Sequence, residues 1–297
     1  MVSLIGLGMR NLSNHNTMKT LLIPVDFSVP STHAVDYAAD LANDRGFNKI
    51  ILIANCIASP LSDYWSNQAD VWDAKREMRK ILSDLNIQLL NLKARLEKRL
   101  HPDIQIDARL RQCFSISSIC KLASSETADL ILIGSNSSQL GTESIIGHQI
   151  INICKNLTVP IMIIPSGSNY QPITHAVVSF DEHSSTEVYY LNRLKHLQNN
   201  KNPTPLERER PGYHPEDIVP ESHNYTLLNS ILRSFKYYVY EQEAYDQQMG
   251  LTKFADSYYS QLIIAMPGSK GFFYNLTHKD ISEKLVMDGH KPVLVLP

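Results

Sequence analysis

Small residues whose types and spacing suit phosphate binding lie in one stretch of the sequence. Gly134 is followed by Ser137 after two residues, and Gly147 and His148 follow after nine more. Small residues let backbone N–H groups approach a phosphate closely, and the N-terminus of a helix adds partial positive charge. The spacing Gly-x2-Ser-x9-Gly, with a helix expected to begin near Gly147, therefore suggests a site for a phosphorylated ligand.

Two further candidate residues close apolar runs earlier in the chain. Asp26 ends the run that starts at Lys19, and Cys56 ends the run that starts at Lys49. In an open parallel sheet, ligands bind outside the carboxyl ends of the strands, where the strand order reverses. A carboxylate at such an end can accept a hydrogen bond from a ribose hydroxyl. The strand ends and the small-residue loop together predict a nucleotide site.

The elements that must position these residues are predicted by their periodicity. Nearly continuous apolar runs, typical of strands buried on both faces, alternate with segments of helical periodicity. A stripe of apolar residues from Met78 to Leu100 predicts one long amphipathic helix. This alternation predicts βαβ units and an α/β, doubly wound parallel sheet. The predicted strands are Lys19–Asp26, Lys49–Cys56, Ile104–Leu110, Leu130–Gly134 and Pro160–Ile164.

The pattern then repeats. Thr174–Asp181 is another apolar run that closes on aspartate, and two later runs match earlier ones at one constant offset: Leu262–Met266 with Leu130–Gly134, and Pro292–Leu296 with Pro160–Ile164. The offset from Asp26 to Asp181 is larger than this, so the second copy is shorter, and the loss lies between its first and third strands. We predict an N-terminal extension over residues 1–17 that the fold does not need, a first domain over 18–168, and a degenerate second domain over 172–297.

Composition limits the class of protein. The formal charge of −2 leaves no basic surplus for nucleic acid, and no apolar run approaches the ~20 residues that cross a membrane. Val2–Met9 is apolar but has no preceding basic residue and no cleavage site, so it does not predict a signal peptide. The four cysteines lack the paired spacing of metal ligands. We expect a cytoplasmic protein without a metal, a nucleic-acid partner or a membrane partner.

At these residues the chain resembles the universal stress protein family. The match includes Pro24-Val25-Asp26-Phe27-Ser28, the loop that starts at Gly134, and the run Gly147–Pro160. It covers residues 18–165 well and 174–297 more weakly. The resemblance implies two tandem domains, each a five-stranded parallel sheet of order 3-2-1-4-5 with helices on both faces. ATP-binding members carry Gly-x2-Gly-x9-Gly followed by serine or threonine.

The resemblance also implies a set of nucleotide contacts in the first domain. Ser137 stands where the family has a glycine, and His148 stands where it has a hydroxyl residue. Two interpretations therefore remain, a working ATP site and a vestigial loop. In the second domain none of the glycines survives, so no nucleotide is expected there. The implied contacts are Pro24, Val25, Asp26, Cys56, Ile133, Gly134, Ser137, Gly147, His148 and Gln149.

These observations favour a non-catalytic regulatory protein of the stress-response type, with unknown protein partners. A genuine ATP-binding sensor is the first alternative, and a scaffold whose second domain binds partners is another. A slow ATP hydrolase or transferase ranks lower, because there is no P-loop lysine, evident base or pair of metal-binding carboxylates. Ser28, His33 and Asp36 lie on one short segment, so helix capping and surface exposure explain them better than a catalytic triad.

The fifth predicted strand of each domain would lie at a sheet edge. Pro160–Ile164 and Pro292–Leu296 are apolar at nearly every position, and an exposed apolar edge invites pairing. The resemblance implies dimerisation through this strand, as in other family members. We therefore expect the two fifth strands to pair antiparallel, as an internal pseudo-dimer with one continuous sheet.

Overall fold

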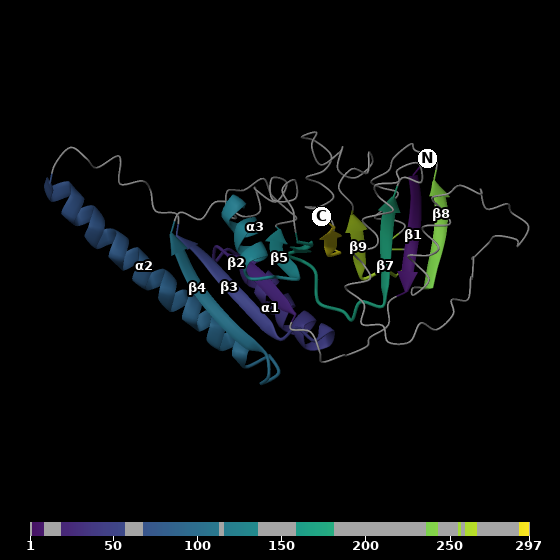
Figure 1. Cartoon of the computed structure of the whole chain (residues 1–297), viewed down its shortest axis with the longest axis horizontal. Coiled ribbons are helices and arrows are strands. Elements are labelled where there is room, and N and C mark those ends of the chain that lie inside the picture. The colour runs from purple at the N-terminus through teal and green to yellow at the C-terminus, as the bar shows by residue number, and fades with distance from the viewer. Residues whose placement is uncertain are drawn as a thin grey trace, which may run out of the picture.

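The computed structural model describes residues 2–8, 19–56, 68–112, 116–135, 159–180, 236–242, 255–256, 259–265 and 291–296. These residues build one ten-stranded sheet of order β4-β3-β2-β5-β6-β10-β9-β7-β1-β8 (Figure 1). In chain order, the strands and helices are β1 (Val2–Gly8), β2 (Thr20–Val25), α1 (Val29–Arg45), β3 (Lys49–Cys56), α2 (Gln68–Glu97), β4 (Gln105–Gln112), α3 (Ile116–Ser125), β5 (Leu130–Ser135), β6 (Ile161–Pro165), β7 (His175–Phe180), β8 (Lys236–Gln242), β9 (Leu262–Ala265) and β10 (Val293–Val295).

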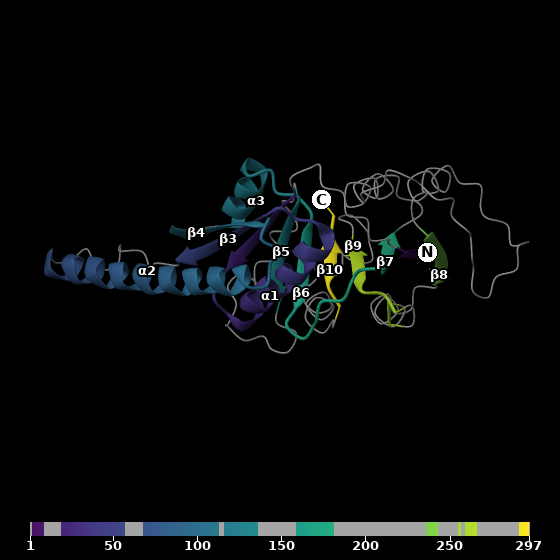
Figure 2. The ribbon, with the colours of Figure 1, turned by 90° about the horizontal axis from the view of Figure 1, so that it is seen from below.

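The first half has the predicted topology. Strands β4-β3-β2-β5-β6 all pair in parallel, which is the order 3-2-1-4-5 by position along the chain. Figure 2 shows α1 and α2 on one face of this sheet and α3 on the other. Every residue of β2, β5 and β6 is buried, as expected for strands covered on both faces. The predicted α/β fold is therefore confirmed for this half.

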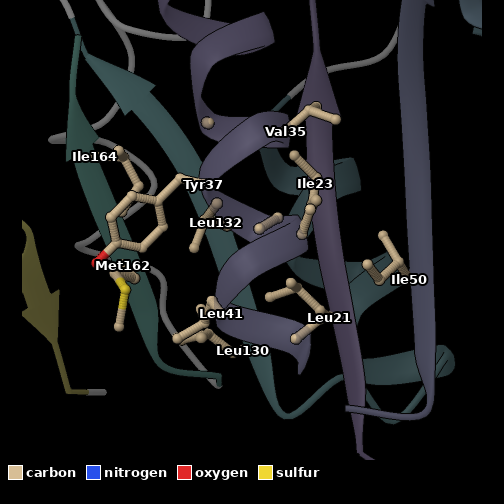
Figure 3. Packing of buried hydrophobic residues seen from close by; sticks show 14 of the residues in the cluster. Leu21, Ile23, Val35, Tyr37, Leu41, Ile50, Leu130, Leu132, Met162 and Ile164 are labelled. Atoms are coloured by element: carbon tan, nitrogen blue, oxygen red, sulfur yellow. The ribbon is translucent and has the colours of Figure 1, made fainter. Parts of the chain in front are cut away.

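Helix α1 is the main covering of the first sheet. Ser28 caps its N-terminus, Pro30 occupies its first turn, and Gly46 ends it in the left-handed conformation with φ +67°. Its buried face, which includes Tyr37 and Leu41, packs on apolar residues of β2, β5 and β6 (Figure 3). This packing fixes the start of α1 against the carboxyl ends of these strands.

The two halves meet through their edge strands. Strand β10 pairs antiparallel with β6, with Leu294 opposite Met162 and Val295 opposite Ile161. Met162 and Val295 are 4% and 1% exposed, respectively. The pairing covers the two apolar edges and makes the sheet continuous.

The second half differs from the prediction in one strand. Strands β7, β9 and β10 are parallel as expected, but β1 lies between β7 and β8 and runs antiparallel to both. The sequence predicts that residues 1–17 form an extension that the fold does not need, whereas the structure places Val2–Gly8 inside the sheet. The physical reason is the missing length between the first and third strands of the second copy. Among the described residues no strand of the second copy itself fills this position, and β1 pairs with the edge of β7 that would otherwise be open.

Candidate functional site

The candidate site lies at the carboxyl edge of the first sheet. Strand β2 has β3 on one side and β5 on the other, so the strand order reverses between β2 and β5. Val25 pairs with Ala54 of β3, and Leu22 pairs with Ile131 of β5. Asp26, Cys56 and Ser135 therefore come at the same edge of the sheet. This is the switch point at which open parallel sheets bind ligands.

Asp26 is held in a tight turn between β2 and α1. Its Oδ1 accepts hydrogen bonds from the backbone N–H of Ser28 at 3.1 Å and from the Ser28 hydroxyl at 2.5 Å. The Ser28 oxygen in turn accepts from the Ser31 N–H at 3.4 Å, which caps the helix. Phe27, between the two, has φ +61°, a conformation that non-glycine residues rarely adopt. The turn thus fixes the Asp26 carboxylate at the N-terminus of α1, where negative charge is favoured.

Gly134 lies under the first turn of α1. A Cβ atom at this position would stand 2.0 Å from the carbonyl oxygen of Pro30 and 3.0 Å from the Ser31 nitrogen. Both neighbours are backbone atoms, so no side-chain movement could make room for it. Gly134 therefore has a packing role that holds with or without a ligand. The sequence motif suggests only the phosphate role; the close approach of helix and strand cannot be read from it.

Three of the other predicted contacts have buried side chains. Pro24, Val25 and Ile133 all lie within strands whose residues are fully buried. Their contribution to a ligand at the sheet edge would therefore come from backbone groups. Cys56 is the last residue of β3, and its side chain lies outside what the structure describes. Ser137, Gly147, His148 and Gln149 also lie outside the described residues.

The residues that could be imagined as a nucleophilic triad are used in other ways. Ser28 caps α1, and His33 Nε2 lies 2.7 Å from the carbonyl oxygen of Ser168. Asp36 pairs with Arg95 at 3.2 Å and with Arg99 at 3.0 Å. The interpretation of Ser28 as a helix cap is therefore confirmed, and the three side chains have separate partners.

The segment between the two halves is bound along α1, which the sequence does not reveal. The Tyr170 hydroxyl donates to Asp44 at 2.5 Å, and its ring makes an edge contact with Tyr37 at 5.1 Å between centroids. Arg45 donates to the carbonyl oxygen of Ile173. Burial raises the pKa of both tyrosines, so both are neutral phenols at physiological pH. Together with His33, these contacts link α1 to the start of β7.

The described ranges do not meet the requirements of a metal site or of a membrane-spanning helix. There, no group of three His, Cys, Asp or Glu side chains is placed to hold a metal ion. Among the helices in those ranges, none combines the length and apolar character needed to span a bilayer. Cys120 is a buried free thiol whose pKa is raised by burial, which makes it unreactive.

Comparison with known proteins agrees with this architecture. A model of the universal stress protein family matches residues 17–165. The chain therefore belongs to the universal stress protein family. In sequence, no curated protein matches it significantly.

One solved structure of the family shares the fold over most of this chain. A universal stress protein from Archaeoglobus fulgidus is 11% identical, covers 93% of this chain and 95% of its own, and has a TM-score of 0.55. Two similar structures cover about half of this chain. One is a universal stress protein from Lactobacillus plantarum (12% identity, 50% of this chain, 99% of its own, TM-score 0.40). The other is a family protein from Arabidopsis thaliana with AMP bound (16%, 52%, 97%, TM-score 0.33).

Proposed function

We propose that the chain is a cytoplasmic, non-catalytic regulator of the universal stress type, with a partly eroded adenine-nucleotide site in its first half. The observation that carries this proposal is the placement of Asp26. Its carboxylate is fixed by Ser28 at the switch point, beside the end of β5. In this place a carboxylate accepts hydrogen bonds from ribose hydroxyls.

The proposed binding mode follows from the elements at this edge. The base would contact backbone groups of Pro24 and Val25 and the end of β3 at Cys56. The phosphates would extend past Gly134 toward the loop that carries Ser137 and His148. A side chain at Ser137 keeps backbone amides farther from a phosphate than glycine does. His148 replaces a hydroxyl donor at the start of a predicted helix, where its cationic form is disfavoured. Weak binding of ATP or AMP follows.

Lack of turnover follows from the same residues. The sequence has no P-loop lysine, and Asp26 Oδ1 is already engaged by both donors of Ser28. Phosphoryl transfer depends on cations that neutralise charge and on a group that orients the nucleophile. The described part of the site supplies neither. We therefore propose that nucleotide acts as a signal in the first half and that no nucleotide binds in the second half.

The test is calorimetric titration of the full chain with ATP and with AMP. Asp26→Asn should weaken binding at least tenfold, because it removes a charged acceptor, a contact worth about 1.5–3 kcal/mol. The matched control is Asp181→Asn, the corresponding aspartate of the second copy, which should leave binding unchanged. Circular dichroism of both variants would show that the fold is kept.

A second experiment restores the residue types of ATP-binding family members at the two positions that differ, Ser137 and His148. Ser137→Gly combined with His148→Ser should tighten binding about tenfold or more, since two contacts of about 1 kcal/mol each are restored. If neither the natural chain nor this variant binds, the first half is a scaffold and the nucleotide proposal is wrong. Release of phosphate from labelled ATP that disappears in Asp26→Asn would instead make the protein a slow hydrolase.

A further inference from the structure

The second half is completed by residues that precede the first half in sequence. Strand β1 makes six residue pairs with β7, from Ser3 opposite Phe180 to Gly8 opposite His175. It makes seven more with β8, from Val2 opposite Gln242 to Gly8 opposite Lys236. Within the described sheet, β8 has β1 as its single neighbour. The position between β7 and β8, which we call the strand slot, therefore decides whether β8 is part of the sheet.

Residues 9–18 must connect the strand slot to the first half. Between Gly8 and Lys19 there are eleven Cα steps, which reach at most about 36–40 Å. In the sheet order, six strand spacings separate β1 from β2. At about 4.8 Å each, they amount to about 29 Å. Most of the reach of this connection is therefore used in crossing the sheet.

The strand directions add to this demand. Strand β1 is antiparallel to β7, and β10 is antiparallel to β6, while the other pairings between β1 and β2 are parallel. Two reversals leave β1 and β2 pointing the same way. The connection therefore leaves the carboxyl end of one strand and enters the amino end of the other. It must cover part of a strand length as well as the width of six spacings, which leaves little slack.

A second copy of the chain offers the same strand slot without this restriction. Exchange of an identical strand keeps every backbone pair, and short connections under strain favour it. The register is already encoded, because the incoming strand has the same sequence as the one it replaces. The partner that fits best is therefore another copy of this chain.

We propose that copies of this chain exchange β1, so that Val2–Gly8 of each copy lies between β7 and β8 of the other in a closed dimer. The exchange links two chains through their second halves and leaves the candidate nucleotide site of each first half in place. It also makes the integrity of the second half dependent on protein concentration.

The first test changes the length of the connection. Deletion of Asn11–Asn14 leaves seven steps, with a reach of about 23–25 Å. This is shorter than the ~29 Å between the strands, so closure within one chain is blocked. Native mass spectrometry should show this variant as a dimer. Insertion of ten Gly/Ser residues after Asn14 is the matched control and should raise the monomer fraction at least tenfold over the natural chain. A monomeric shortened variant would overturn the proposal, whether or not its second half remains protected from hydrogen exchange.

The second test detects the exchanged strand directly. With the four native cysteines replaced by alanine, chains carrying Gly6→Cys are mixed with chains carrying Val177→Cys, its register partner. The pair Ile5→Cys and Val178→Cys is made as well, because adjacent antiparallel pairs alternate in geometry and only one type holds the side chains close. Oxidation should give covalent dimers of the two kinds of chain. Gly6→Cys mixed with Asn43→Cys, on the surface of α1, is the control that should give none. If disulfides form within doubly substituted chains and never between mixed chains, β1 stays in its own chain and the proposal is wrong.

Discussion

The two halves of the molecule fill the same strand positions in different ways. The first half builds five parallel strands from one continuous stretch, and their carboxyl ends meet at one edge. The second half keeps the strand positions but fills the second one with β1, which runs in the opposite direction. Sheet pairing requires only matching backbone donors and acceptors, so a reversed strand can complete the sheet. A ligand site at the strand ends requires more than that.

The reversed strand changes the edge of the second half that corresponds to the candidate site. In the first half, the end of β3 at Cys56 borders the switch point beside Asp26. In the second half, the amino end of β1 lies there instead, since Ser3 pairs with Phe180 near the carboxyl end of β7. In the sequence, Met266 stands at the position aligned with Gly134, so a residue with a long side chain replaces the glycine there. This difference in strand direction supports our proposal that no nucleotide binds in the second half.

Removal of β1 should disrupt the second half most severely, while the first half keeps its fold. A chain that begins at Met18 lacks β1 and leaves β8 without its neighbour in the described sheet. We expect the second half to lose on the order of 5 kcal/mol or more of stability, given about 1 kcal/mol for each of several lost hydrogen bonds. Hydrogen exchange should show loss of protection at residues 175–180 and 236–242, with residues 20–56 still protected.

The sequence alone predicts that this deletion is neutral. An unchanged melting temperature, with both segments protected, would restore that prediction and contradict the role of β1. A useful control is the chain that begins at Met18, mixed with a separate peptide of the sequence Val2–Gly8. Recovery of protection by the peptide would show that the strand itself, and not the connection, stabilises the second half.

Substitutions in the β6–β10 strand pair that joins the two halves should reduce stability almost as much. Met162→Glu or Val295→Glu places a carboxylate in a strand pair that is almost fully buried. The cost should be about 4 kcal/mol, because the charge has no partner there. Limited proteolysis should then cut between the halves, and aggregation should increase as the apolar edges become exposed. Leu90→Glu, at a side chain that is 53% exposed on α2, is the control. It should change stability by less than about 0.5 kcal/mol, as surface substitutions usually do.

Substitution of Gly134 tests the packing that distinguishes the first half. Gly134→Ala would force its Cβ onto backbone atoms of Pro30, so α1 or β5 must move. We expect a loss of about 2–3 kcal/mol in urea denaturation, as for other overpacked cores. Gly46→Ala is the matched control: its φ of +67° is unfavourable for alanine, but the space around it is open. It should cost about 1 kcal/mol. Equal losses in the two variants would contradict a packing role for Gly134.

The sequence predicts the first half well because its signals are local. Continuous apolar runs mark the buried strands, and Ser28, Pro30 and Gly46 mark the ends of α1. The switch point follows from strand order once the family is recognised. The role of β1 could not be predicted, because an apolar segment contains no information about which distant edge it will pair with. Likewise, a glycine at position 134 is compatible with phosphate binding and with close packing under a helix. Only the short distance from Gly134 to Pro30 in the structure identifies the packing role.

The smallest expected effect concerns an ion-pair network whose central glutamate has no counterpart in the second half. Glu126, which follows α3, accepts from Lys49 of β3 at 3.2 Å and from Arg109 of β4, which also binds Asp107. At the offset that relates β9 to β5, the second half has Tyr258 in place of this glutamate. The hydrogen bond from Arg109, followed by that from Lys49, holds the pKa of Glu126 below its ordinary value of 4.5.

The pH dependence of this network has a definite sign. Because the folded pKa is lowered, the stabilisation is complete above pH 4.5 and is lost as pH falls through the lowered value. Glu126→Gln should therefore cost about 1 kcal/mol at pH 7 in urea denaturation. The difference from the natural chain should vanish in acid. Glu97→Gln, which removes a solvent-exposed pair with Lys93, is the control and should cost less than about 0.5 kcal/mol. A Glu126→Gln effect that is the same at pH 7 and in acid would show that packing, not charge, stabilises this corner of the first sheet.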